Sequence, residues 1–481
     1  MRRGHFIDGL ESGQDGPSFQ VINPATRRPM GSAALGSAAD VDRAVDAALA
    51  AQPTWWGLSP GERERTLLRC ADHLEACGEQ LTETLMAESG STLAKARFEV
   101  SYTPALLRAA AGEARRLYGD TFPNDRPDRV SIVLREPVGV VGVISPFNAP
   151  LALLIKMVAF PLAAGNAVVA KPSEHTPLVA VRLAQLLSDA GLPRGLFSVV
   201  TGFGPDCGKR LVEHPEVAGI AFTGSTQVGS IIGAEATRRM KRVQLELGGK
   251  NPVLVLADMN AQEAAAEVAA GAFFHGGQIC MSGSRVIVEA GLVEEFTDAL
   301  VAEARKLRFG DLADEDTAYG PLICAEAVER VDAHVQDALR GGAILLTGGT
   351  IQEGWTYAPT VLLEPPRDSL AWREETFGPV VTVSSAPDLE AAIEAANESD
   401  YGLSAAVLTH DLARAMDAAR RIRAGAVHLG MHSFQSNTMA PVGGVGASGL
   451  GRSGGRYSIE HFTELKWISL QVGGAANRAV T

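Results

Sequence analysis

Between residues 129 and 430 the sequence alternates between short apolar runs and longer stretches with helical periodicity. AVVAK (167–171) and LFSVVTG (196–202) have the composition of buried strands, and LVAVRLAQLLSDAGLP (178–193) between them is typical of a helix that ends at Gly191. A strand, a helix and a second strand in this order predict parallel pairing, with helices on both faces of the sheet. The alternation therefore predicts an α/β fold.

A second series of the same kind begins at NPVLVLAD (251–258), so we expect two α/β units that join near residue 248. The segment before residue 119 is mostly helical in pattern, and the polar, proline-rich GDTFPNDRPD (119–128) follows it. With 481 residues, of which 46% are hydrophobic, the chain is long enough for two or three domains with large cores.

Charge and composition exclude several classes of protein. The formal net charge of −13 argues against binding to nucleic acids or anionic membranes, both of which attract basic surfaces. Lys156 and Pro161 interrupt the most apolar stretch, 151–165, and no apolar core follows the two N-terminal arginines, so neither a spanning helix nor a secretory signal is expected. Five cysteines without a CxxC pair favour reduced thiols in a cytoplasmic protein. Because the histidines form no HxxH pair, no metal site is expected.

Three side chains occur in contexts that suit a nucleophile and its helpers. Cys280, in GGQICMSG, is flanked by small residues that would leave a thiolate accessible. Glu246, between leucines in LELGGKNP, is in apolar surroundings that suit a general base. Asn148, between two prolines in ISPFNAP, could donate its amide to a developing oxyanion. A buried structural thiol, a solvent-facing carboxylate and a turn asparagine are the alternatives.

Two strand ends carry features of a nucleotide site. AFTGSTQVG places Gly224 and Ser225 where a strand should give way to a helix, whose N-terminus would attract a phosphate. In AVVAKPSEH, Glu174 lies near the carboxyl end of a strand, where an acidic side chain accepts hydrogen bonds from ribose hydroxyls and repels a 2′-phosphate. An ordinary strand–helix turn and a solvated charged loop are the alternatives.

The order and spacing of six motifs resemble those of the aldehyde dehydrogenase superfamily, and the likeness runs from about residue 6 to residue 470. The motifs are SPFNAP, AKPSEHTP, FTGSTQVG, LELGGKNP, GGQICMSGSR and REETFGPVV. LELGGK followed downstream by GQxC is a specific signature of this family. His275, the GQICMS sequence and the ending FTELKWISL look like its benzaldehyde, salicylaldehyde and vanillin dehydrogenase branch.

The resemblance implies a mechanism for oxidising an aldehyde to an acid. Cys280 would attack the aldehyde carbonyl, and Asn148 and the backbone N–H of Cys280 would hold the oxyanion. Glu246 would activate the water that hydrolyses the resulting thioester. A CoA-acylating enzyme and a non-catalytic protein that retained the fold are the alternatives; the first generally lacks the glutamate, and the second has no need of the three residues.

The resemblance also implies a nicotinamide cofactor. Lys171 and Glu174 would meet the adenosine ribose, and Glu375 and Phe377 would meet the nicotinamide side. The negative charge of Glu174 should disfavour the 2′-phosphate of NADP, so we expect NAD. The other residues expected at the cofactor are Gly204, Phe222, Gly224, Ser225 and Gly229.

The family fold implies three parts: a Rossmann-like parallel-sheet domain for the cofactor, a second α/β domain for catalysis, and a small β oligomerisation element. The apolar final strand ELKWISLQV needs a partner to cover its edge, which implies a homodimer or homotetramer. The cofactor domain is expected over 1–118 and 139–247, and the catalytic domain over 248–448. The oligomerisation element is expected over 119–138 and 449–481.

Four positions are expected along the substrate tunnel, namely Ala149, His275, Met281 and Val442. Ala149 and Val442 replace aromatic residues that are common in the family, which predicts room for a bulky or aromatic aldehyde. Lys156 would face a phenolate or carboxylate of the substrate, unless it is a surface lysine whose charge reaches into water.

Overall fold

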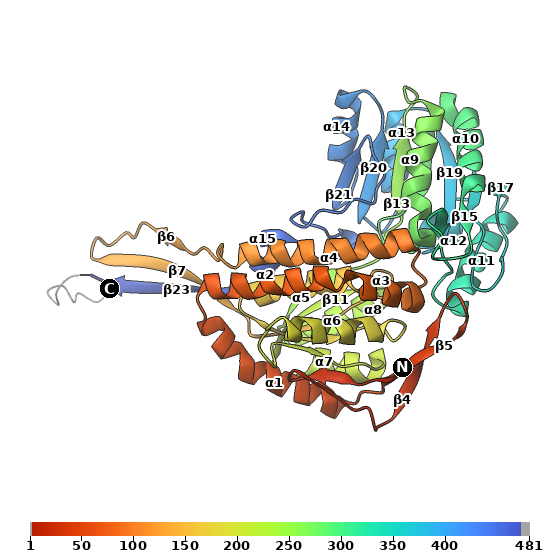
Figure 1. The fold of residues 1–481 in the computed structure, drawn as a ribbon. Helices are drawn as coiled ribbons and strands as arrows, with labels where there is room; N and C mark the ends of the chain where they lie inside the picture. The colour runs from red at the N-terminus through yellow and green to blue at the C-terminus, as the bar shows by residue number, and fades with distance from the viewer. Residues whose placement is uncertain (1, 473–481) are drawn as a thin grey trace.

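The computed structural model describes residues 2–472, which form two α/β units and a slender β arm that projects from the first unit (Figure 1). The first unit is built on an eight-stranded sheet and the second on a seven-stranded sheet. Within the described residues no helix is long and apolar enough to cross a membrane, and no group of His, Cys, Asp or Glu side chains could hold a metal ion.

The strand order of the first sheet is β22-β12-β11-β8-β9-β10-β2-β3. The strands from β12 to β10 run parallel, as the alternation predicts, whereas β22, β2 and β3 pair antiparallel at the edges. The central strands β8 and β9 are buried throughout because helices cover the sheet. The bounds in sheet order are Gly449–Leu450, Arg242–Glu246, Val217–Thr223, Val140–Ile144, Ala167–Lys171, Phe197–Val199, His5–Ile7 and Leu10–Ser12.

Helices of the first unit come from both the N-terminal segment and the crossovers. The N-terminal segment is mostly helical, as its pattern predicts, and Cys77 separates two of its helices because it leaves the helical conformation (φ −100°, ψ 14°). Pro104 lies inside α4, and this helix packs against α2 and α5. The helices are α1 (Ala38–Gly57), α2 (Pro60–Ala76), α3 (Gly78–Ser89), α4 (Leu93–Glu113), α5 (Ala152–Ala163), α6 (Pro177–Asp189), α7 (Lys209–Glu213) and α8 (Thr226–Arg238).

The second sheet has the order β17-β18-β19-β14-β13-β20-β21, and all of its neighbours pair in parallel except β17. A separate apolar core lies on each face of this sheet, one formed with α9 and α10 and the other with α13 and α14. The strands, in sheet order, are Ile344–Thr347, Thr360–Leu363, Val380–Ala386, Gly283–Glu289, Asn251–Val255, Ser404–Leu408 and Ala426–Leu429. The helices are α9 (Ala261–Phe273), α10 (Val293–Lys306), α11 (Ala325–Arg340), α12 (Leu370–Arg373), α13 (Leu389–Asn397) and α14 (Leu412–Arg421).

Two small sheets complete these units. The strands β1 (Arg2–Arg3), β5 (Arg28–Ala34) and β4 (Ser18–Asn23) form one of them beside the first unit. The other pairs β15 (Arg308–Phe309) with β16 (Thr317–Tyr319) in the second unit.

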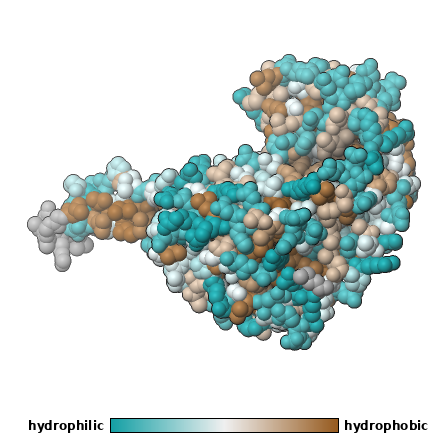
Figure 2. All heavy atoms as spheres, in the orientation of Figure 1, coloured by the Kyte–Doolittle hydropathy of each residue, from teal (hydrophilic) through white to brown (hydrophobic). Residues whose placement is uncertain are grey.

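The arm consists of β6 (Asp120–Phe122), β7 (Arg129–Pro137) and β23 (Thr463–Gln471), paired antiparallel. Apolar side chains gather on it, as the brown spheres show (Figure 2). The exposed ones are Phe122, Val130, Leu134, Leu465, Trp467 and Leu470. An uncovered apolar surface of this kind marks an interaction site.

The segment 449–481 is expected as part of the oligomerisation element, but its residues lie in two different parts of the structure. β22 joins the first sheet beside β12, and α15 (Gly455–His461) packs against α4 and α5. Gly449 permits this pairing, because a Cβ there would lie 2.0 Å from the Leu245 carbonyl oxygen. Residues 449–462 thus belong to the first unit, 463–472 follow the arm, and 473–481 lie outside the described residues.

Candidate active site

Cys280 lies between α9 and β14 on the wall of a cavity of about 680 Å³, including the part open to solvent. The chain reaches this position through a sharp turn, because His275, Gly276 and Gly277 all have positive φ (52°, 63° and 71°). A Cβ on Gly277 would lie 2.1 Å from the carbonyl oxygen of Gly378, so only glycine fits there. The turn brings the cysteine loop of the second unit against the first.

Asn148 joins the two units at this cavity. It lies in the loop before α5, lines the same cavity as Cys280 and is buried. Its Nδ2 donates a hydrogen bond to the backbone carbonyl of Gln278, at 2.8 Å. The Gln278 amide is itself held by the carbonyl of His275 and the backbone N–H of Ile323. Since an amide has two N–H groups, the second one of Asn148 stays free for a ligand.

Glu246 ends β12 and is buried, 8% exposed. It does not line the Cys280 cavity itself, but Lys156 does, and the Lys156 Nζ lies 3.9 Å from Glu246 Oε2. Gln244 Nε2 donates to Glu246 Oε1 at 3.2 Å. Lys156 is therefore a buried lysine of α5 on the cavity wall, and the alternative that it is a surface lysine is wrong.

Burial, together with the charges of Glu375 and Glu246, raises the pKa of the Cys280 thiol to about 12, against the opposing charge of Lys156. The thiol is half-buried and stays protonated near pH 7 in the free protein. A thiolate is the reactive form, so attack by Cys280 requires a base that removes the proton. Glu246 is a buried carboxylate whose charge acts on the thiol, so it is a candidate for this base.

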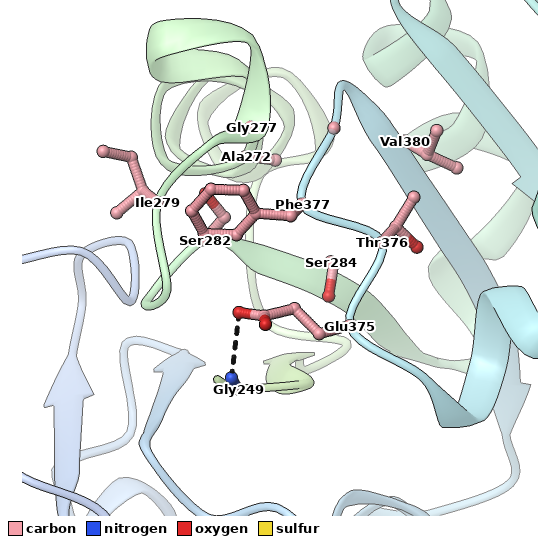
Figure 3. Close-up of a pocket in the computed structure, with 11 residues that line it drawn as sticks. Gly249, Ala272, Gly277, Ile279, Ser282, Ser284, Glu375, Thr376, Phe377 and Val380 are labelled. Carbon is pink, nitrogen blue, oxygen red and sulfur yellow. Dashed lines mark hydrogen bonds between the residues drawn. The ribbon is translucent and has the colours of Figure 1, made fainter. Parts of the chain in front are cut away.

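A second, smaller pocket adjoins the cavity through Ile279, which lines both. Glu375 and Phe377 reach it from the loop before β19 (Figure 3). Glu375 Oε1 accepts a hydrogen bond from the Gly249 backbone N–H at 3.1 Å, and burial raises the pKa of Glu375 to about 7. Phe377 takes a positive φ of 51° and sets its ring edge-on to Phe147 at 5.8 Å. Both residues expected on the nicotinamide side therefore line one pocket.

The remaining cofactor candidates gather where strands of the first sheet end. Lys171 ends β9, and its Nζ lies 3.1 Å from Glu174 Oε2. Phe222 and Gly224 lie at the end of β11, and Ser225 caps α8. Gly229 packs on Leu247, where a Cβ would clash at 2.3 Å, whereas Gly204 faces open space.

This arrangement fits a dinucleotide. The carboxyl ends of parallel strands are where α/β sheets bind nucleotides, and the N–H groups that begin α8 suit a phosphate. The exposed apolar side chains of Val228 and Ile231 on α8 offer a surface for an aromatic base.

Three of the four expected tunnel residues line the cavity, namely Ala149, Met281 and Val442. His275 does not. It is 2% exposed, and its Nε2 has no hydrogen-bond partner among residues 2–472. Burial, with the charge of Lys95, holds the pKa of His275 well below its usual range, so the ring is neutral. His275 takes a left-handed conformation in the turn before Cys280 and is buried outside the cavity lining.

Aromatic side chains line the cavity from segments that the motifs do not include. Phe98 stands edge-on to Phe274 and to Phe434, both at 6.4 Å, and stacks on Tyr102 at 5.8 Å. Phe274 and Phe434 stack at 5.6 Å. The signal in the sequence was weak: positions 95, 98, 99 and 102 share one face of α4, which is also the spacing of an ordinary helix packing face.

A buried ion pair fixes this face of α4 to the site. Lys95 Nζ bonds Glu99, and both residues are buried. Glu99 Oε1 also accepts hydrogen bonds from the backbone N–H groups of Leu151 and Ala152, at 2.7 and 3.0 Å. The carboxylate thus caps the N-terminus of α5, directly after the loop that holds Asn148.

We predict that alkylation of Cys280 by iodoacetamide accelerates about tenfold per pH unit from pH 7 to pH 9, because the thiolate fraction grows in that proportion below the pKa. The rate is measured by mass spectrometry of the Cys280 peptide. Cys280→Ala serves as the control, because any alkylation of this variant reports the other half-buried cysteines, Cys77 and Cys324. A plateau below pH 8 would show a low thiol pKa and contradict this electrostatic description.

Comparisons with known proteins agree with the resemblance in sequence. A model of the aldehyde dehydrogenase family matches residues 11–468. A vanillin dehydrogenase of Pseudomonas fluorescens is 40% identical over 463 residues, 96% of each chain. A glutarate-semialdehyde dehydrogenase of Pseudomonas aeruginosa is 37% identical over 473 residues, 98% of each chain.

The fold agrees as well. The crystal structure of an NAD-dependent aldehyde dehydrogenase from Sinorhizobium meliloti superimposes with a TM-score of 0.97, at 38% identity, over 100% of this chain and 97% of that one. The predicted α/β fold class is confirmed. This chain therefore belongs to the aldehyde dehydrogenase family.

Proposed function

We propose that the protein oxidises an aromatic aldehyde to its carboxylic acid with NAD. The observation that carries this proposal is the shared cavity: Cys280 and Asn148 lie on its wall together with four aromatic side chains, and Ile279 lines both this cavity and the pocket of Glu375. An aldehyde bound in this cavity has a nucleophile and a hydrogen-bond donor within reach.

In the first half of the reaction, Glu246 accepts the Cys280 proton and Sγ bonds to the aldehyde carbon. The carbonyl oxygen then becomes an oxyanion, which the free N–H of Asn148 and the backbone N–H of Cys280 stabilise. The nicotinamide cofactor, when bound, supplies the hydride acceptor that turns the thiohemiacetal into a thioester. Lys171, Glu174, Glu375 and Phe377 would hold it in place.

In the second half, Glu246 first releases the proton that it took from Cys280 to the solvent. It then takes a proton from water as the resulting hydroxide attacks the thioester carbon. The carbon–sulfur bond breaks, the acid leaves, and Cys280 recovers its proton. Gln244 and Lys156 on either side of Glu246 keep its carboxylate in place. A CoA-acylating enzyme would not need a buried carboxylate beside the thiol, so Glu246 favours hydrolysis.

The lining of the cavity favours an aromatic aldehyde over a dicarboxylic semialdehyde. The carboxylate of such a semialdehyde would need a free cation in this buried space. Of the two lysines on the wall, Lys95 is bonded to Glu99 and Lys156 lies beside Glu246. The ring faces of Phe98, Phe274 and Phe434 instead suit a flat apolar ring.

Glu174 supports NAD over NADP. The charge of Lys171 and the Lys171 hydrogen bond lower the pKa of Glu174 even though burial acts in the opposite direction, so the carboxylate is ionised near pH 7. A 2′-phosphate beside it would be repelled.

The exposed apolar arm supports assembly into a homodimer or homotetramer. β23 lies at one edge of its sheet and carries Leu465 and Trp467, 58% and 64% exposed. A second copy of the chain would cover this edge and its side chains.

We predict that the purified protein with NAD forms NADH from benzaldehyde and vanillin with a kcat/KM about tenfold or more above that for glutarate semialdehyde. NADH absorbance measures the rates. Cys280→Ala should abolish turnover, and Cys324→Ala, which changes a half-buried cysteine outside both pockets, should retain it. A preference for the semialdehyde, or turnover by Cys280→Ala, would refute the assignment.

Glu174→Gln should raise kcat/KM with NADP relative to NAD by about tenfold, because it removes the charge that repels the 2′-phosphate. The matched control is Glu303→Gln. Glu303 also pairs with a lysine three residues away, Lys306 at 2.6 Å, but on the surface of α10. An unchanged cofactor ratio in Glu174→Gln would remove the basis for NAD preference.

A further inference from the structure

Most polar groups on the wall of the substrate cavity already have a partner in the protein. Lys95 and Glu99 bond each other. Asn148 donates one N–H to Gln278, and Gln435 Nε2 donates to the His432 carbonyl at 3.1 Å. These groups are therefore less available to form a hydrogen bond with a polar group on the substrate.

Of the remaining polar residues on the wall, Ser436 and Asn437 are exposed to solvent, whereas Tyr102 is half-buried. Tyr102 lines the cavity from α4, and its hydroxyl makes no hydrogen bond with any residue in the described part of the chain. Burial raises the pKa of Tyr102 to about 12, so the phenol is protonated and can both donate and accept. It is thus a neutral, unpaired polar group in a largely aromatic space.

The position of this hydroxyl is fixed relative to the reacting groups. The Tyr102 ring stacks on Phe98 with an angle of 8° between the planes. One helical turn earlier on α4, Glu99 accepts hydrogen bonds from the start of α5, directly after Asn148. An aldehyde held by Cys280 and Asn148 therefore meets the hydroxyl at a fixed place along its ring.

An unpaired hydroxyl on a cavity wall discriminates between substrates. A substrate that displaces water but offers no polar atom leaves the hydroxyl without a partner, which costs free energy. A substrate with an oxygen at the matching place pairs with it, and sites built this way separate analogues that differ by one hydroxyl.

We propose that Tyr102 determines specificity by hydrogen bonding to an oxygen substituent, a hydroxyl or methoxy group, on the ring of the aromatic aldehyde. The assignment rests on the proposed aldehyde oxidation. It concerns a neutral substituent, because the lysines on the wall lie beside carboxylates.

The test is Tyr102→Phe, which removes one oxygen and retains the ring on Phe98. With NAD, kcat/KM is measured for benzaldehyde and for its ortho, meta and para hydroxy derivatives. For at least one hydroxy isomer it should fall about tenfold, the loss of one hydrogen bond, mainly through KM. For benzaldehyde it should not fall by more than about twofold and should rise if the unpaired hydroxyl is costly, because the substitution removes that hydroxyl. The matched control is Tyr118→Phe, whose ring is 71% exposed and outside the cavity.

The outcomes separate the two claims. If the unmodified protein oxidises aromatic aldehydes but Tyr102→Phe lowers kcat/KM equally for benzaldehyde and all three hydroxy isomers, or for none, the role of Tyr102 is wrong and the proposed function stands. If the unmodified protein oxidises none of the four aldehydes, the proposed function fails and the assignment of Tyr102 fails with it.

Discussion

The hydrogen bond from Asn148 Nδ2 to the Gln278 carbonyl connects the two α/β units at the point where their active residues meet. Asn148 belongs to the loop between β8 and α5 of the first unit, and Gln278 to the cysteine loop of the second. Both groups are buried, so neither could lose its partner without a cost in free energy. The bond holds Asn148 against the loop of Cys280, on the wall of the cavity that both residues line.

The electrostatics of the site depend on this closure. Cys280 is removed from water close to the carboxylates of Glu375 and Glu246, which keeps the thiol protonated in the free protein. Lys156 supplies the opposite charge within the same buried space. A nucleophile of this kind reacts only when a base takes its proton, which limits side reactions of the thiol with other electrophiles.

The candidate site residues that the sequence indicates lie in short motifs. Asn148, Glu246 and Cys280 each follow a local pattern, and the alternation of strands and helices predicted the parallel core of both sheets. The aromatic lining of the cavity could not be predicted from the sequence, because Phe98, Phe274 and Phe434 are far apart in the chain and meet only in the folded protein.

Backbone conformation explains two differences from the expectations. The positive φ of His275 turns its ring into the protein, and no residue type at that position signals such a turn by itself. Likewise, β22 is only two residues long, so its place in the first sheet depends on the close approach of Gly449 to Leu245 and not on a strand-like pattern. Long elements with a clear period are predictable, whereas tight turns and short edge strands depend on tertiary contacts.

The central claim is that the substrate becomes covalently attached to Cys280 and that Glu246 releases it. Intact-protein and peptide mass spectrometry of Glu246→Gln, mixed with NAD and benzaldehyde and quenched in acid, measures this directly. We expect a benzoyl adduct on the Cys280 peptide that accumulates in Glu246→Gln, with one NADH formed per adduct, and that is scarce in the unmodified protein. NADH formation without any adduct on Cys280, or the adduct on another residue, would contradict the mechanism.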